Sequence, residues 1–110
     1  MKKEHCQCTY QSEKQVLTVL LLGEIDHHRA VAVRCEIDDK IYETKPKKTV
    51  LDLSKIDFMD SSGLGLIMGR LALMQKIGGE LSIKKPNARV QRILELSGIG
   101  RMIGIEEEEK

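Results

Sequence analysis

An aspartate and two serines stand at a turn that leads into an apolar segment with helical spacing. Asp60, Ser61 and Ser62 lie where the first backbone amides of such a helix lack partners and where the helix dipole is positive. A phosphate on Ser61 would add about −1.5 to −2 charges there, stabilised by the amides and repelled by Asp60 and by any acidic partner. From spacing alone, capping of the helix by the two serines is the simpler interpretation.

The same segment is unusually rich in glycine. Gly63, Gly65 and Gly69 take positions that alanine or leucine would favour, and each interior glycine costs roughly 1 kcal/mol relative to alanine. Two explanations remain open: tight packing of the helix against a sheet, or close approach of another backbone or a partner. Spacing alone favours packing.

Acidic and imidazole side chains gather between Gly23 and His28. Glu24, Asp26, His27 and His28 are residue types that bind metal ions or transfer protons, so a small metal-dependent hydrolase is one alternative function. Adjacent residues of a helix point about 100° apart, however, which suits one shared ion poorly. Capping of a helix by Asp26, with histidines that face solvent or a partner, is the favoured interpretation, and we predict no metal site.

Cysteine spacing and motif content argue against catalysis. Cys6, Cys8 and Cys35 are too few and odd in number for a disulfide framework. His5 beside Cys6 and Cys8 could form a metal clip, but the spacing lacks the two to four intervening residues of common zinc sites. The sequence has no Walker A loop, dinucleotide-binding glycine pattern or nucleophile elbow. We therefore predict neither enzymatic activity nor a cofactor.

Composition limits the partners and the location. The 110 residues and 41% hydrophobic content suit one domain spanning residues 1–110, and a net charge of +1 gives no field to attract nucleic acid. No apolar run approaches the roughly 20 residues that cross a bilayer, and no secretory signal follows Met1. We expect a cytoplasmic protein that does not touch membranes and is a monomer when free, since no apolar helical face is left over.

The first half of the chain predicts a hairpin, a helix and a strand. Glu4 to Tyr10 and Gln15 to Leu22 favour β-structure, with the second strand stopping at Gly23. After the Asp26 cap, apolar residues at three- and four-residue spacing predict an amphipathic helix. Those residues are Ala30, Val33, Ile37 and Ile41. Val50 to Leu53 is the next strand candidate.

The second half repeats this alternation. A second helix is expected to end at Gly78–Gly79. Its apolar face is predicted to hold Leu64, Ile67, Met68, Leu71, Met74 and Ile77. Glu80 to Lys84 alternates as a strand, and Pro86 suits the first turn of a third helix. Arg101 to Ile105 fits an edge strand, and the acidic run Glu106 to Lys110 is expected to be a frayed tail.

The predicted order is therefore strand, strand, helix, strand, helix, strand, helix, strand. Strands that alternate with helices imply parallel pairings joined by right-handed crossovers. We predict an α/β fold, with a mixed, mostly parallel sheet of about five strands that begins with an antiparallel hairpin and is covered by about three helices.

Four segments in this order resemble the STAS family, and within it the anti-sigma factor antagonists (anti-anti-sigma factors) of the sporulation type. They are Gly23 to His28, Phe58 to Gly65, Gly78 to Glu80 and Leu96 to Ile99. The resemblance runs from about Glu13 to Ile105, and the family's fold has the element order predicted above. Many relatives carry another terminal helix after the last strand, so the core of this chain is expected to be less covered.

The resemblance implies a partner-switching cycle. The unphosphorylated protein would bind an anti-sigma factor that is also a serine kinase with its own ATP, and this binding would free a sigma factor for transcription. In the family the first serine of the Asp-Ser-Ser-Gly motif accepts the phosphate, which corresponds to Ser61, and a serine phosphatase removes it. The kinase-facing surface would hold Glu24, Asp26, His27, Asp60, Ser62, Gly63 and Leu64. Close cousins act in the stressosome or as cytoplasmic accessory domains of transporters, which is the second alternative.

Overall fold

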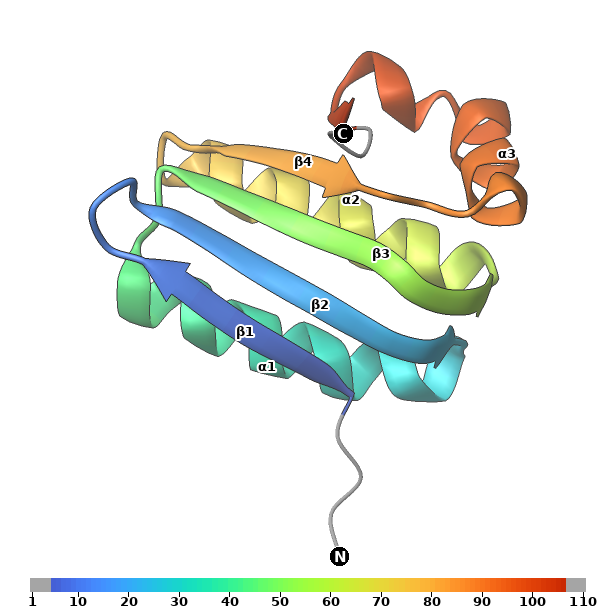
Figure 1. The fold of residues 1–110 in the computed structure, drawn as a ribbon, viewed down its shortest axis with the longest axis horizontal. Coiled ribbons are helices and arrows are strands. Elements are labelled where there is room, and N and C mark those ends of the chain that lie inside the picture. Colours follow the sequence, from blue (N-terminus) through green and yellow to red (C-terminus); the bar gives the residue numbers. More distant parts are fainter. Residues whose placement is uncertain (1–4, 107–110) are drawn as a thin grey trace, which may run out of the picture.

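The computed structural model describes residues 5–106 and arranges them as a five-stranded mixed sheet with helices (Figure 1). The elements are β1 (Cys6–Gln11), β2 (Val16–Ile25), α1 (His27–Thr44), β3 (Lys48–Met59), α2 (Ser61–Lys76), β4 (Glu80–Lys84), α3 (Ala88–Ser97), the 3-10 turn η1 (Ile99–Arg101) and β5 (Gly104–Glu106). β1 is antiparallel to β2, and all later neighbours are parallel. The predicted α/β class, opening hairpin and element order are confirmed.

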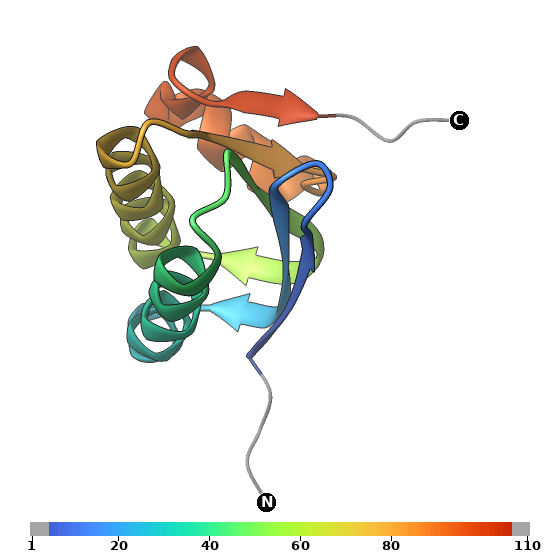
Figure 2. The same cartoon turned by 90° about the vertical axis from the view of Figure 1, so that its left-hand side faces the viewer.

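The strands lie in the sheet in the same order as in the chain, β1-β2-β3-β4-β5. Because crossovers between parallel strands are right-handed, α1 and α2 cover the same face of the sheet, as Figure 2 shows. The predicted stripe of α1 is confirmed: Val33, Ile37 and Ile41 are buried, and Ala30 packs half-buried against the core. None of the helices in the described part of the chain is long and apolar enough to cross a membrane.

The buried face of α2 differs from the predicted one. Two predicted residues, Met68 and Ile77, are 39% and 38% exposed. Leu66 and Arg70 take buried positions that the pattern left outside. The other predicted residues are buried or half-buried: Leu64, Ile67, Leu71 and Met74. The pattern left out Arg70 because it counts only apolar residues.

Strands β2 and β3 are longer than predicted. β2 continues past Gly23 to Ile25, and β3 covers 12 residues where the sequence predicted only Val50 to Leu53. The pairing of the two strands shifts register twice, and one shift follows Gly23, whose φ of 81° suits glycine. These irregularities interrupt the alternation of buried and exposed residues by which a strand is recognised.

The start of α3 corrects the expectation for Pro86. Asn87 is the N-cap of α3, with its Oδ1 accepting a hydrogen bond from Val90 N at 2.8 Å, so Pro86 precedes the helix instead of lying in its first turn. The Asn87 side chain also donates from Nδ2 to Ile56 O at 2.9 Å, which ties the helix start to β3.

The C-terminal expectations are also corrected. The segment Arg101 to Ile105 is not one strand: η1 ends at Arg101, and β5 begins only at Gly104. Glu106 belongs to β5 and is not frayed, since its Oε2 lies 2.7 Å from Lys48 Nζ and accepts from Ser82 Oγ at 2.7 Å. These two contacts lower the pKa of Glu106. The rest of the expected acidic tail, residues 107–110, lies outside the described residues.

A buried ion pair joins α1 and α2. Arg70 Nε lies 2.8 Å from Asp38 Oδ1, with 7% of the arginine side chain and 26% of the aspartate side chain exposed. The contact is ionic and not an aligned hydrogen bond, and Arg70 Nη1 has no hydrogen-bond partner in residues 5–106. Burial lowers the pKa of Arg70, and the Asp38 carboxylate opposes that shift. The charged guanidinium therefore depends on Asp38.

Replacing Asp38 with alanine should destabilise the protein by about 2 kcal/mol, because it leaves a buried guanidinium without its counter-charge. Urea unfolding followed by circular dichroism measures the change. Asp39→Ala is a matched control, since Asp39 is the next residue of α1 and is exposed, and its effect should stay within about 0.5 kcal/mol. Equal losses in the two variants would contradict the role of the ion pair.

Candidate functional site

The ends of β2 and β3 bring the two motif-bearing segments together. Their parallel register pairs Ile25 with Met59 and Glu24 with Phe58. Beyond the strands, Asp60 N donates to Ile25 O at 3.3 Å. Because α1 and α2 begin directly after these strands, both helix N-termini lie at the same end of the sheet (Figure 1). Residues far apart in the chain thus share one surface.

Aspartates cap both helices. Asp26 Oδ1 accepts from Arg29 N at 2.9 Å, and Asp60 Oδ1 accepts from Ser62 N at 2.7 Å. The hydrogen bond from Arg29 N is the main cause that lowers the pKa of Asp26. The predicted Asp26 cap is confirmed. The interpretation that the serines cap α2 is wrong, because Asp60 occupies the cap position.

Ser61 is the first residue of α2 and is exposed. Its hydroxyl forms no hydrogen bond to another side chain or backbone group between residues 5 and 106. The next two amides are occupied, since Ser62 N binds the Asp60 side chain and Gly63 N donates to Asp60 O at 3.0 Å. A phosphate on Ser61 would not find these two amides free, contrary to the expectation that the first turn of the helix holds it.

An exposed ridge of small and apolar side chains runs along α2 from Ser61. Gly65, Met68 and Ala72 follow it at three- and four-residue spacing, and all are exposed. We call these four residues the α2 ridge. Three of the four residues have small side chains or none, and Met68 is apolar. The exposed surface of α2 beside Ser61 therefore carries little side-chain bulk and no charge.

A groove of about 200 Å³ lies between α1 and α2 next to the ridge. It is lined by His27, Ala30, Val31, Arg34, Ser62, Gly65 and Leu66. Val31 is 48% exposed, so the groove offers an apolar contact, while His27 and Arg34 bring basic side chains. Sequence reasoning missed Val31 and Arg34, although their spacing after His27 places all three on one side of α1.

The three glycines of α2 have different surroundings. A Cβ at Gly63 would overlap the side chain of Met59, whereas a Cβ at Gly65 or Gly69 would meet no atom within 4 Å. Packing therefore explains Gly63 but not the other two. Gly63 is buried and contacts Met59, so it does not offer the surface contact expected of it.

The remaining predicted partner-facing residues reach the surface to different extents. Glu24 and His27 are exposed, and Asp26, Asp60, Ser62 and Leu64 are half-buried. His28 is exposed as well. Within residues 5–106, no three histidine, cysteine or acidic side chains gather closely enough to hold a metal ion.

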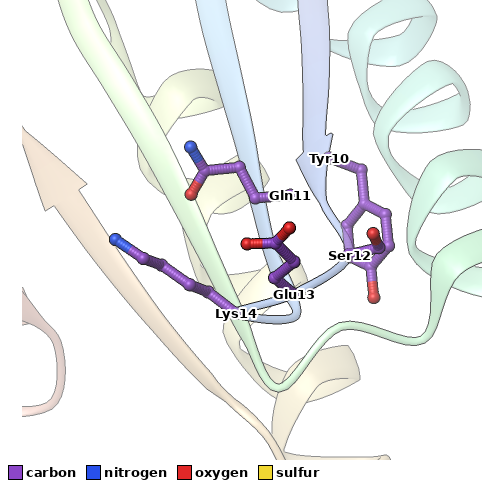
Figure 3. Close-up of a pocket in the computed structure, with 5 residues that line it drawn as sticks. All are labelled: Tyr10, Gln11, Ser12, Glu13 and Lys14. Carbon is purple, nitrogen blue, oxygen red and sulfur yellow. The ribbon is translucent and has the colours of Figure 1, made fainter.

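A second concavity, of about 320 Å³, lies at the turn between β1 and β2 (Figure 3). It is lined by Tyr10, Gln11, Ser12, Glu13 and Lys14. Tyr10 and Ser12 lie on one side of the turn and Gln11 and Lys14 on the other, so polar groups do not converge on one point. The turn precedes β2 and therefore lies at the opposite end of the sheet from Ser61.

Comparison with known proteins identifies the family. Residues 8–110 match the model of the STAS domain. The chain belongs to the STAS domain family. This STAS domain is 39% identical over 103 residues to the anti-sigma F factor antagonist of Paenibacillus polymyxa. The matched region covers 94% of this chain and 88% of the relative.

Solved structures share its fold. The anti-sigma factor antagonist SpoIIAA in its unphosphorylated form superimposes with a TM-score of 0.80 and 25% identity, covering 96% of this chain and 89% of that one. The Bacillus cell fate determinant SpoIIAA in the phosphorylated form gives a TM-score of 0.73 at 24% identity, covering 96% and 92% of the two chains. The resemblance to the STAS family seen in the sequence is confirmed.

The contrast between the glycines predicts opposite stability changes. Gly65→Ala should stabilise this STAS domain by about 1 kcal/mol, because alanine favours helix and its Cβ enters open space. Gly63→Ala should destabilise it by about 1–3 kcal/mol, because Met59 must move. Urea unfolding of both variants measures the difference. Destabilisation by Gly65→Ala would show that the surroundings of Gly65 are closed.

Proposed function

We propose that this STAS domain is an anti-sigma factor antagonist switched by phosphorylation of Ser61. In the unphosphorylated form it binds an anti-sigma factor that is also a serine kinase, and a sigma factor is released. The kinase transfers a phosphate from its own ATP to Ser61, and this phosphorylation ends binding to the anti-sigma factor. A serine phosphatase removes the phosphate and restores binding. The proposal rests on one observation above all: the serine that begins the α2 ridge is exposed, and its hydroxyl forms no hydrogen bond within residues 5–106.

The α2 ridge and the adjacent groove are the proposed docking surface. The open space over Gly65 lets a partner's backbone approach the helix closely, which gives a reason for a costly glycine. Met68 and Val31, 39% and 48% exposed, offer apolar contacts on either side of it. The basic side chains of His27 and Arg34 line the groove, and the predicted contact Glu24 is exposed near the end of β2.

A phosphate on Ser61 would act on binding and leave the fold unchanged. The Ser61 side chain is exposed and its hydroxyl makes no hydrogen bond within residues 5–106, so its modification breaks no described contact. The phosphate would place about −1.5 to −2 charges next to Asp60, whose carboxylate already caps α2. A partner packed over Gly65 would have to strip water from this charge, which costs several kcal/mol.

The relatives support the same role. The Paenibacillus polymyxa protein is named an anti-sigma F factor antagonist, and SpoIIAA exists in unphosphorylated and phosphorylated forms. Those names describe the relatives. Their fold agrees with the arrangement of β2, β3 and the two helix starts that builds the surface described here.

Incubation with the cognate anti-sigma factor and Mg-ATP should add one phosphate to this protein. Intact mass reports the addition, and peptide mapping should place it on the peptide that contains Ser61. Ser61→Ala should stay unmodified, whereas Ser62→Ala is the matched control and should still be phosphorylated, because only the backbone amide of Ser62 takes part in the cap. An unmodified mass with a demonstrably active kinase would overturn the switch and favour a transporter or stressosome role.

Binding to the anti-sigma factor should separate the variants without loss of folding. We expect Ser61→Ala to bind like the wild type and Ser61→Asp to bind at least about tenfold more weakly, which is about 1.4 kcal/mol. Gly65→Ala should also weaken binding although it stabilises the helix. Titration calorimetry measures the affinities, with Arg92→Ala on the exposed surface of α3 as the control. Equal affinity of the two Ser61 variants would contradict the mechanism.

A further inference from the structure

The groove between α1 and α2 carries basic groups and lacks acidic ones. None of the described residues that line it has a carboxylate, whereas His27 and Arg34 have basic side chains. The sequence of α2 contains no acidic residue that could balance them. Most of the acidic residues of α1 line a different groove, which opens toward β1. They are Glu36, Asp39 and Glu43.

The remaining acidic residue of α1, Asp38, is already paired. Its Oδ1 lies 2.8 Å from Arg70 Nε. Arg34 precedes Asp38 by one turn of α1, and Leu66 precedes Arg70 by one turn of α2, so the ion pair lies just beyond the inner end of the groove. The Arg34 guanidinium forms no ion pair or hydrogen bond within residues 5–106. Two guanidiniums therefore share one carboxylate.

The excess positive charge acts on the buried arginine as well. Burial lowers the pKa of Arg70, the Asp38 carboxylate opposes this shift, and the charge of Arg34 lowers the pKa again. Arg70 Nη1 is buried without a hydrogen-bond partner among the described residues, so a group that enters the groove does not reach it directly. Arg34 is exposed and presents the unbalanced charge to solvent.

We propose that this groove receives an acidic side chain of the anti-sigma factor, whose carboxylate pairs with the Arg34 guanidinium. The inference rests on the proposed function, since it names what the docking surface recognises in that partner. Gly65 lines the groove together with Arg34, so a partner segment that passes over the glycine can place one side chain in the groove. An arginine and a carboxylate can form two parallel hydrogen bonds, which fix the orientation of the partner as well as its affinity.

The same contact gives a reason for the direction of the switch. Ser61 directly precedes Ser62, which lines the groove. A phosphate on Ser61 would bring about −1.5 to −2 charges close to the place where the partner's carboxylate binds, and like charges repel each other. The phosphate would also offset the positive charge of Arg34 that attracts this carboxylate. Phosphorylation thus weakens the electrostatic attraction between the two proteins.

Titration calorimetry with the cognate anti-sigma factor tests the contact in the unphosphorylated protein. Arg34→Met keeps an unbranched apolar side chain and removes the charge, so the affinity should fall at least about tenfold. Arg34→Lys keeps the charge without the paired donors and should bind with intermediate affinity. Arg89→Met, on the exposed surface of α3, is the matched control and should bind like the wild type. Wild-type affinity of Arg34→Met would overturn the inference.

Thermal melting separates a role in recognition from a role in the fold. Arg34 has no carboxylate of its own within residues 5–106, and its charge disfavours the charged form of Arg70. The melting midpoint of Arg34→Met should therefore equal or exceed that of the wild type. A lower midpoint together with weaker binding would assign Arg34 to the fold and overturn its role in recognition.

Substitution of the exposed acidic residues of the anti-sigma factor, one at a time, by the corresponding amides identifies the paired residue. One of these variants should lose affinity for the wild type but lose no more when it is combined with Arg34→Met, because both changes remove the same contact. Lysine at that partner position should restore binding to Arg34→Glu. Losses that all add to the loss from Arg34→Met would show that no partner carboxylate binds Arg34.

The binding measurements also separate this inference from the proposed function. Weak binding of Ser61→Asp beside unchanged binding of Arg34→Met would support the switch and reject the acidic contact. A wild-type protein that does not bind the anti-sigma factor would overturn the proposed function and the acidic contact together. Weak binding of both variants, with the Arg89→Met control intact, is the expected result.

Discussion

The parallel register that pairs Ile25 with Met59 is the constraint on which the rest of the site depends. This register aligns the C-terminal ends of β2 and β3. The aspartate that follows each strand caps a helix, so α1 and α2 both start at the same end of the sheet. A hydrogen bond from Asp60 N to Ile25 O continues the pairing of β2 with β3 one residue beyond the end of β3. The ion pair between Arg70 and Asp38 then holds the two helices against each other farther along. The groove beside Ser61 results from these contacts together.

Much of this arrangement was predictable because local chemistry specifies it. The cap at Asp26, the strand Glu80–Lys84 and the glycine end of α2 follow from residue types that suit one backbone conformation. The motif segments could be placed near each other only through the resemblance to the STAS family, since distances along the chain do not give a strand register. Two predictions from the hydrophobic pattern failed because of contacts between elements far apart in the chain. The register shifts between β2 and β3 hid the full length of these strands, and the burial of Arg70 changed the buried face of α2.

The glycines of α2 show how stability and recognition place different demands on one helix. Gly63 is required by the fold, because Met59 fills the space that a side chain would take. Gly65 is not required by any described neighbour, and it weakens the helix that carries it. Sequence reasoning could count both glycines but could not tell them apart, because the difference lies in a residue of the preceding strand. At Gly65 the helix gives up stability, and the open space over the glycine is what a partner that docks beside Ser61 would need.

The order of the strands has a further consequence for how the protein folds. Every strand pairs with its neighbour in the chain, so each new pairing closes a loop of one hairpin turn or one helix with its connections. Short loop closures cost less chain entropy than long ones and favour rapid folding. The β2–α1–β3 unit and the start of α2 contain both motif segments, while β4, α3 and β5 follow later in the chain. During synthesis on a ribosome, all residues of the docking surface therefore emerge before the last two strands of the sheet.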